Sequence, residues 1–464
     1  MVVQHNMQAM NANRMLNITT TQQSKATEKL SSGYKINRAA DDAAGLSISE
    51  KMRKQIRGLD QASTNAQDGI SAVQTAEGAL TEVHDMLQRM NELAVQAANG
   101  TNSASDREAI QNEIQQLTTE IDRVAETTKF NETYLLKGNG KTSTAIIAAK
   151  DAGISGTLTG VGTGTATFKM TTLKTGQSIS IGAKGYTIGT SVGTVRSNVE
   201  GAVGTGSIVT INGTAYTIDT KTSMADNKFT TEDLVDIIKD GDTVIVGTHT
   251  YVAMKDSDGD GIGDNDASVI SSSKAYCLIA KELGAASSLG TNPGKEAKVI
   301  GDIPSGEYSV KNTQVSFKIQ EGTVQVSQGL QIGVHVGADA DGSNKISFTM
   351  DTLDAAGLGI KGLNIVDNTG AKATYAIDSI ADAIAKVSAQ RSELGAIQNR
   401  LEHTIANLDN VVENTTAAES QIRDTDMAET MVEYSKNNIL AQAGQSMLAQ
   451  ANQATSGVMS ILQG

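Results

Sequence analysis

Aromatic residues are scarce in this chain of 464 residues, and tryptophan is absent. Because aromatic residues make up only 3% of the sequence, its cores have to be built from Ala, Leu, Ile, Val and Met. Pockets that bind small molecules are usually apolar and lined in part by aromatic side chains. The composition therefore favours helix seams and small β-domains over an enzyme with a deep cleft.

A surplus of basic residues is also lacking. The chain has 52 acidic and 38 basic residues, which gives a formal net charge of −14. Nucleic acids and anionic membranes attract clustered Lys and Arg, so we expect no nucleic-acid binding. We expect no membrane insertion either, because the sequence has no apolar run long enough to span a bilayer. The first residues do not have the pattern of an ordinary secretory signal, which predicts a cytoplasmic protein or one exported by another route.

Cysteine is almost absent, since Cys277 is the only one. It can form no internal disulfide, and we interpret it as a small buried apolar residue. A nucleophilic cysteine needs a histidine partner, and none of the five histidines lies close to it in the sequence. No histidine pair has the spacing of a zinc protease. We therefore predict that the chain is not an enzyme.

Composition divides the chain into three parts. Both ends are rich in Ala, Gln, Asn, Glu and Leu and contain no proline. The middle, residues 141–370, is rich in Gly, Thr, Ser and Val and holds both prolines. This order predicts helices at both ends and strands between them. The predicted fold class is α+β, with long coiled-coil-like helices from both termini packed together around a central β-rich insert.

The N-terminal part contains the clearest helical pattern. Apolar residues recur at steps of three or four from residue 52 to residue 97, which is the spacing of a coiled-coil seam. The segment NGTN at 99–102 ends this helix, and Ser105 with Glu108 predicts a capping box for a second one. The stripe consists of Met52, Ile56, Leu59, Ala62, Ala66, Ile70, Val73, Ala76, Leu80, Val83, Leu87, Met90, Ala94 and Ala97.

The C-terminal part has helical stripes of the same kind. No charged side chain follows Lys436, although a solvated helix face normally carries Lys and Glu. A narrow apolar stripe with a neutral remainder indicates burial on several sides by other chains. We therefore predict a polymerisation seam along the last helix, formed by Ile439, Ala443, Met447, Ala451, Val458 and Ile461.

The middle contains a threefold repeat. The segments GQSISIGAKGYTI (176–188), GSIVTINGTAYTI (206–218) and GDTVIVGTHTYVA (241–253) align without gaps. Each alternates β-branched residues, turns, and ends in a strand with a tyrosine at the same place, which predicts a β-hairpin. We expect a stack of hairpins rather than a single sheet of long strands.

One loop in the middle could hold a metal ion. In DSDGDGIGDND (256–266), Asp256, Asp258 and Asp260 stand at every second position, Gly261 permits a tight turn, and Asp264 follows. Such a loop places hard oxygen ligands around one centre, which suits Ca²⁺. Position twelve is Ala267 instead of a bidentate Glu, so a structural calcium and a solvated acidic turn both remain possible. No other cofactor is predicted.

The two ends carry a resemblance to a known family. Residues 30–80, beginning LSSGYKINRAADDAAGLS, and residues 87–114 resemble the N-terminal region of bacterial flagellins. Residues 391–408 and 439–453 resemble the flagellin C-terminal region. The chain is thus similar over both ends to the subunits of the bacterial flagellar filament, and the middle resembles nothing we can name.

The resemblance implies five segments. It implies an N-terminal filament-core helix in residues 1–43, N-terminal rod helices in 44–140 and a surface-exposed β-rich variable region in 141–370. A C-terminal rod helix in 371–424 and a C-terminal filament-core helix in 425–464 would complete the subunit.

The resemblance also implies function and partners. The chain would polymerise with itself into a helical filament for motility, outside the cell, after export without a cleaved signal peptide. Its implied partners are the flagellar export chaperone, the type III export apparatus, and the filament cap and hook–filament junction proteins. The alternatives are a flagellar junction protein, or a filament protein whose central region acts as an adhesin.

A host receptor is a further implied partner. In flagellins the rod segment is sensed by Toll-like receptor 5, and the matching positions of this chain are Arg89, Leu93 and Glu113. Arg89 and Leu93 are four residues apart and would share one helix face. We interpret all three residues first as contacts between subunits and second as receptor contacts.

Overall fold

The computed structural model describes residues 6–223, 226–300, 309–311, 313–367 and 369–463. These residues form two compact units. The first unit combines Met1–Ser71, Gly333–Ser347 and Ile397–Gly464, and the second combines Ala72–Ile332 with Phe348–Ala396.

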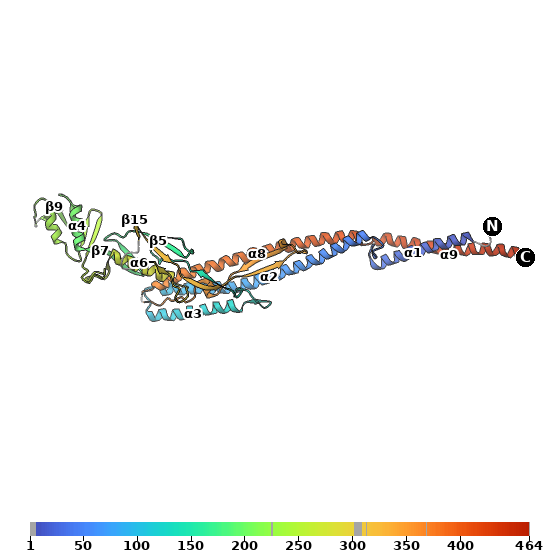
Figure 1. The fold of residues 1–464 in the computed structure, drawn as a ribbon, viewed down its shortest axis with the longest axis horizontal. Coiled ribbons are helices and arrows are strands. Elements are labelled where there is room, and N and C mark those ends of the chain that lie inside the picture. Colours follow the sequence, from blue (N-terminus) through green and yellow to red (C-terminus); the bar gives the residue numbers. More distant parts are fainter. Residues whose placement is uncertain (1–5, 224–225, 301–308, 312, 368, 464) are drawn as a thin grey trace. The chain divides into compact units, whose positions relative to one another are not determined.

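Two terminal helices lie side by side in the first unit (Figure 1). Helix α1 (Met7–Ser32) begins at Asn6, whose side-chain oxygen accepts a hydrogen bond from the backbone N–H of Ala9. It ends at Gly33, which has a φ of +77° and closes the helix with a left-handed cap. Helix α9 (Met427–Gln463) runs antiparallel to α1, because Asn6 Nδ2 donates to the carbonyl of Ala451 while the backbone N–H of Thr425 donates to the carbonyl of Gly33.

The facing sides of α1 and α9 form two heptad seams. The less exposed residues of each helix recur at alternating steps of three and four, which is the geometry of a coiled coil. Most of these residues are small or polar, so the seam buries little apolar area. The seam of α1 consists of Ala9, Ala12, Leu16, Thr19, Gln23, Ala26 and Leu30, and that of α9 of Thr430, Tyr434, Asn437, Ala441, Gly444, Leu448 and Ala451.

A segment from the predicted variable region packs on helix α2 (Ala43–Ala98) in the first unit. Asn65 Nδ2 donates to the carbonyl of His335 over 3.0 Å. A Cβ on Gly69 would lie 3.0 Å from Val334 Cγ2, so the Val334 side chain packs directly on the helix backbone because this helix position has no side chain. A segment of the predicted variable region thus packs on helix α2 within the subunit. The surface exposure of 141–370 as a whole stays a prediction.

The second unit contains a three-helix core. Helix α3 (Ala104–Thr127) and helix α8 (Ala371–Arg423) accompany the last part of α2 there. The predicted stripe of α2 is confirmed, because its members from Ala62 to Ala97 are buried, apart from the half-buried Ile70. The capping box of α3 is at Ser103 and Asp106 instead of Ser105 and Glu108, since Ser103 Oγ accepts from Asp106 N and Asp106 Oδ2 accepts from Ser103 N.

The remaining elements are short. The helices are α4 (Val192–Ala202), α5 (Thr231–Ile237), α6 (Ser272–Ser287) and α7 (Ala355–Leu358), with a 3₁₀ turn at Gly342–Asn344. The strands are β1 (Lys129–Phe130), β2 (Thr133–Tyr134), β3 (Thr142–Ile146), β4 (Thr157–Thr159), β5 (Thr165–Thr171), β6 (Ser178–Ile181), β7 (Lys184–Ser191), β8 (Ile208–Ile211), β9 (Thr214–Ile218), β10 (Lys228–Phe229), β11 (Thr243–Val246), β12 (His249–Met254), β13 (Val269–Ser271), β14 (Lys298–Val299), β15 (Ser309–Lys311), β16 (Gln314–Gln320), β17 (Thr323–Ser327), β18 (Leu330–His335) and β19 (Lys345–Met350).

The three predicted hairpins are present as β6–β7, β8–β9 and β11–β12. Asn212 and Gly213 turn the second hairpin with φ of +48° and +85°, the left-handed pair that a type I′ turn requires. The expectation of a stack is wrong, however. β8 pairs with β11 and β12 pairs with β7, so the hairpins join through their edges into one sheet in the order β10-β9-β8-β11-β12-β7-β13, with β6 on β7. Joining the hairpins at their edges pairs backbone groups that a stack would leave exposed.

Two apolar cores hold the strand-rich part together. One lies between α4, α5 and the strands of the second and third hairpins, and includes Val195, Val209 and Leu234. The other joins α6 to β5 and β16 and includes Phe168 and Phe317, whose ring centroids are 6.3 Å apart. Tyr375 of α8 belongs to this second core, so the strand-rich part is anchored on helix α8.

Candidate assembly and ligand sites

The predicted polymerisation seam on α9 divides into two sets of residues. Ile439 and Met447 are 67% and 64% exposed, and Ala443 is exposed beside them, because α1 covers the other face of the helix. Ala451 is half-buried and its carbonyl accepts the bond from Asn6, so it belongs to the seam with α1. The side chains of Val458 and Ile461 lie outside the described residues.

The outer face of α1 carries large apolar side chains as well. Met7, Met10, Met15 and Ile18 are exposed, and a groove runs along this face between Met10 and Lys25. Helix α9 has further exposed apolar residues, namely Met427, Met431, Val432 and Leu440. Exposed apolar side chains gathered in this way mark interaction surfaces. We call the exposed apolar residues of α1 and α9 the assembly faces.

Arg89 and Glu113 form an ion pair between α2 and α3. Arg89 Nε donates to Glu113 Oε1 over 3.0 Å, and both side chains are about half exposed. The hydrogen bond that Arg89 donates to Glu113 raises the pKa of Arg89, with a second contribution from the bond that it donates to Glu92. Leu93 differs, because it is only 2% exposed and packs into the helical core. Leu93 is therefore not on the surface of the subunit, whereas Arg89 and Glu113 are. The receptor role of the three residues stays a prediction.

The aspartate loop brings three of its four predicted ligands together. Asp256, Asp258 and Asp260 each offer a carboxylate oxygen, and these oxygens lie within 4.8 Å of one another. Asp264 instead accepts the backbone N–H of Ser257 across the loop. The loop follows strand β12 and leads into β13 and α6, so a single helix flanks it. The three carboxylates fit a hard cation such as Ca²⁺.

Arg107 is a buried residue that the sequence analysis missed. Its guanidinium is 2% exposed and donates to the carbonyls of Ala97 (2.8 Å), Asn99 (3.2 Å) and Asp367 (3.2 Å). It therefore satisfies carbonyls at the C-terminal end of α2, where a positive charge is also favoured by the helix dipole. The only signal in the sequence is that Arg107 stands three residues before Ile110, at a core position of α3.

Glu321 is a second buried charge that the sequence analysis missed. Its carboxylate is 5% exposed and accepts backbone N–H groups of Ala149 (3.1 Å), Gly162 (2.7 Å) and Gly164 (2.8 Å). Three donors on one carboxylate fix the loop before β5 to the turn after β16. Nothing in the sequence around Glu321 indicates burial.

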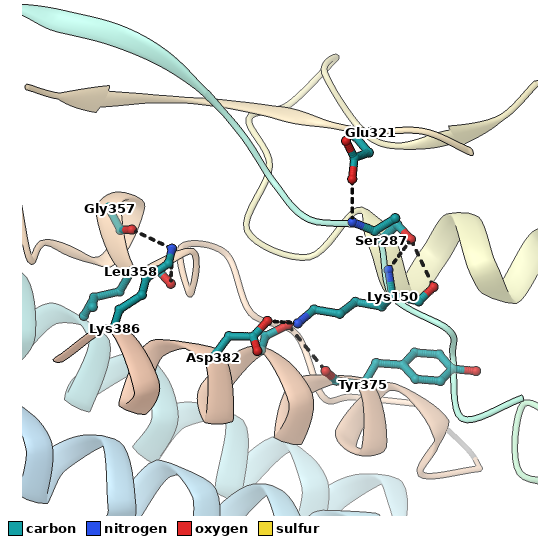
Figure 2. Close-up of polar contacts among 10 residues, drawn as sticks. Lys150, Ser287, Glu321, Gly357, Leu358, Tyr375, Asp382 and Lys386 are labelled. Carbon is teal, nitrogen blue, oxygen red and sulfur yellow. Dashed lines mark hydrogen bonds and ion pairs between the residues drawn. The ribbon is translucent and has the colours of Figure 1, made fainter. Parts of the chain in front are cut away.

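Polar contacts also connect residue 150 to two helices. Figure 2 shows Lys150 between Ser287 of α6 and Asp382 of α8, with an ion pair from Lys150 Nζ to Asp382. Ser287 Oγ accepts the backbone N–H of Lys150 over 2.9 Å. Farther along α8, Lys386 Nζ donates to the carbonyl of Gly357 over 3.1 Å, and burial lowers the pKa of this lysine.

Lys386 also lines a cavity of about 550 Å³ between β17 and α8. Two other polar side chains around it are bonded to backbone: Thr352 Oγ1 donates to the carbonyl of Ser327 over 2.8 Å, and Gln390 Nε2 donates to the carbonyl of Thr349 over 3.3 Å. These contacts hold strands and loops on the helix.

Cys277 in α6 is half-buried, less buried than the sequence analysis predicted.

The ends of the chain match two family models, described as the bacterial flagellin N-terminal helical region (residues 3–141) and the bacterial flagellin C-terminal helical region (residues 377–462). A flagellin of Clostridium tyrobutyricum is 41% identical to this chain over 456 residues, which is 98% of this chain and 100% of the relative. The chain belongs to the bacterial flagellin family. It is therefore a structural subunit of the flagellar filament, and flagellins are structural proteins that serve motility.

A second flagellin and two solved structures are also similar to this chain. A flagellin of Halalkalibacterium halodurans is 33% identical over 462 residues and covers the full length of both chains. Among solved structures, FliC from Burkholderia pseudomallei matches with a TM-score of 0.25 at 20% identity, over 72% of this chain and 99% of that one. The hook-associated protein HAP-3 from Legionella pneumophila matches with a TM-score of 0.35 at 14% identity, over 80% and 98%.

The flagellin family and the structure together confirm the predicted fold class, with helices from both ends and strands in the middle. Helix α8 ends at Arg423 and helix α9 begins at Met427. Among the residues that the structure describes, no helix is both long and apolar enough to cross a membrane.

Proposed function

We propose that this flagellin polymerises through the assembly faces of α1 and α9, which neighbouring subunits cover in the filament. The observation that supports the proposal is that Ile439 and Met447 are about two-thirds exposed although they lie in the part of α9 after Lys436, which carries no charged side chain. Burying a side chain of this size stabilises an interface by about 1.5–3 kcal/mol. Because every subunit repeats these faces, small contributions add up along the polymer.

A double substitution tests this proposal. Ile439→Gln with Met447→Gln leaves the seam with α1 untouched, so the monomer should keep its helix content by circular dichroism. Seeded polymerisation of the variant, measured by sedimentation and electron microscopy, should be lost. The matched control is Gln445→Asn with Gln450→Asn, which changes exposed polar positions of the same helix. Polymerisation of the double Gln variant at the rate of the unchanged chain would contradict the proposal.

The export route is part of the same proposal. Exposed apolar faces on α9 would need cover inside the cell, which a dedicated flagellar export chaperone would provide before the type III apparatus releases the subunit outside. Cap and hook–filament junction proteins would then meet the same helices at the ends of the polymer. Mass spectrometry of the filament protein sheared from cells tests the export route, because export without a cleaved signal leaves the N-terminal region intact.

A second candidate function is recognition by host Toll-like receptor 5. The observation that favours it is the exposed ion pair of Arg89 and Glu113, which presents both charges on the surface of α2 and α3. Arg89→Ala with Glu113→Ala should weaken receptor signalling in a reporter cell assay without unfolding the helices. Glu120→Ala with Arg123→Ala removes another exposed ion pair of α3 and serves as the control. Equal loss of signalling in both variants would count against a specific role of the first pair.

We also propose that the aspartate loop holds a structural calcium ion. Support comes from the three carboxylates that converge in the loop, since their mutual repulsion is relieved by a cation. Adding CaCl₂ should raise the melting temperature of the full chain, and Asp258→Asn should abolish the rise. Asp226→Asn, in the corresponding loop of the second repeat, is the control. A calcium response that survives Asp258→Asn would exclude this site.

A further inference from the structure

The methionines of this chain are distributed unevenly between exposed and buried places. In the part of the chain that the structure describes, all exposed methionines lie on α1 and α9, and their exposed fractions run from 49% to 71%. Those elsewhere, at 52, 86, 90, 170, 254 and 350, are buried or half-buried. The exposed set consists of Met7, Met10, Met15, Met427, Met431 and Met447.

The exposed methionines also contribute much of the assembly faces. Met7 and Met10 are three residues apart on α1, and Met427 and Met431 are four apart on α9, so each pair covers one stretch of helix surface. Met447 lies on the stripe with Ile439, on the side of α9 that α1 does not cover. A chemical change at these sulfurs would therefore change the surface that polymerises.

We propose that these six methionines are oxidation sites whose conversion to the sulfoxide blocks the free subunit from assembling. The oxidant is a peroxide of the hydrogen peroxide class. The thioether sulfur attacks one peroxide oxygen, an S–O bond forms and the O–O bond breaks. The sulfur loses two electrons, the peroxide is reduced, and the departing oxygen leaves as water after taking up a proton. This inference rests on the proposed assembly through α1 and α9.

Two physical consequences follow from the oxidation. The sulfoxide is polar, so it disfavours burial in an interface that the thioether favours. Oxidation also follows exposure, so subunits already in the filament are protected while free subunits are not. The modification therefore acts before assembly, and methionine sulfoxide reductases reverse it.

The experiment uses the purified full chain, oxidised as monomer or as filament with hydrogen peroxide. Peptide mass spectrometry should find sulfoxide at the six positions roughly tenfold faster in the monomer than in the filament. Seeded polymerisation of the oxidised monomer should require a roughly tenfold higher concentration, because several buried contacts are lost. A variant with Leu at all six positions, compared with its own untreated form, should lose none of its polymerisation to peroxide. The matched control is a variant with the half-buried Met52 and Met86 replaced by Leu, which should not protect polymerisation against peroxide.

Several outcomes would overturn the inference. The inference is wrong if oxidised monomer polymerises like untreated monomer. It is also wrong if the six-Leu variant is as sensitive to peroxide as the unchanged chain, or if monomer and filament are oxidised equally fast. If the six-Leu variant does not polymerise before oxidation, recovery of the oxidised unchanged chain with sulfoxide reductase decides in its place. If the untreated chain fails to extend seed filaments, the assembly proposal itself is wrong. The untreated control therefore separates a failure of the assembly proposal from a failure of the oxidation inference.

Discussion

Leu16 of α1 lies against Gly444 of α9, where a Cβ on the glycine would be 3.4 Å from Leu16 Cδ1. This contact sets the register of the two antiparallel helices. With Leu16 opposite Gly444, the two seams match residue for residue, so that Gln23 faces Asn437 and Ala9 faces Ala451. The coil is therefore in register along its described length, although few of its seam residues are large and apolar.

Replacing Gly444 with Ala should stabilise the coil. The added methyl group would stand at ordinary contact distance from Leu16, and Gly in a helix interior costs about 0.5–1 kcal/mol relative to Ala. We expect the free energy of unfolding of α1 and α9 to rise by about that amount, as measured by thermal unfolding followed by circular dichroism. Gly457→Ala, in the same helix, should give the propensity gain alone. A lower melting temperature of Gly444→Ala would contradict the close packing described here.

Asn437 gives a second prediction for the same coil. It is buried, and its Nδ2 has no hydrogen-bond partner within the described part of the chain. A buried polar group without a partner costs about 1–3 kcal/mol, so Asn437→Leu should stabilise the pair of helices by about 1 kcal/mol. A polar seam residue also fixes register, so crosslinking of cysteines placed at 16 and 444 should become less specific. A variant that is less stable than the unchanged chain would contradict this account.

The helical part of the fold was predictable because its information is local. The steps of three and four from Ala62 to Ala97 identify the buried side of α2 without any knowledge of its partners. The hairpin turns were predictable for the same reason, since Asn212-Gly213 specifies its own backbone. Each of these features is determined by neighbours in the sequence.

The features that could not be predicted depend on distant residues. The sheet order could not be read from the hairpins, because β8 meets β11 only after a long connection. On α9, the sequence shows apolar residues but does not show which side α1 covers, so Ala451 was grouped with Ile439. Arg107 and Glu321 are buried against backbone carbonyls and amides, and no pattern of side chains in the sequence indicates these contacts.

Removing the guanidinium of Arg107 should destabilise the second unit. Arg107→Ala leaves the carbonyls of Ala97, Asn99 and Asp367 without their donors, and each buried bond to a charged group contributes about 1.5–3 kcal/mol. We expect a loss of at least about 3 kcal/mol in urea unfolding followed by circular dichroism. Arg123→Ala, at an exposed ion pair of α3, should cost less than about 0.5 kcal/mol. Similar losses in the two variants would show that burial is not what makes Arg107 important.

The carboxylate of Glu321 can be tested with a near-isosteric change. In Glu321→Gln one oxygen becomes an amide NH₂, which would face a backbone N–H of Ala149, Gly162 or Gly164 with no bond to make. We expect a loss of about 2 kcal/mol from this unpaired donor. Glu296→Gln, an exposed carboxylate that accepts the N–H of Gly294, is the control and should be nearly neutral. Hydrogen exchange of the Gly162 and Gly164 amides should speed up only in the first variant.

The start of α8 should lose stability in acid because of Asp367. Burial would raise the pKa of this carboxyl, but hydrogen bonds from Thr369, Gly370 and Lys372 outweigh burial and hold the pKa below the ordinary value of 3.8. Since the folded pKa is lower than the unfolded one, the stabilisation is present above pH 3.8 and disappears as pH falls through the folded pKa. Asp367→Asn should therefore be less stable than the unchanged chain at pH 7, with a difference that shrinks in acid.

Asp378, on the same helix, provides a control of opposite sign. Burial raises the pKa of this carboxyl, so its charged form opposes folding at neutral pH. Asp378→Asn should then be more stable than the unchanged chain at pH 7, and this gain should also vanish in acid, where both proteins are neutral at the position. Thermal melts of the three proteins from pH 7 to pH 3 measure both differences. If the two variants shifted stability in the same direction at pH 7, the bonds to Asp367 would not stabilise its charge.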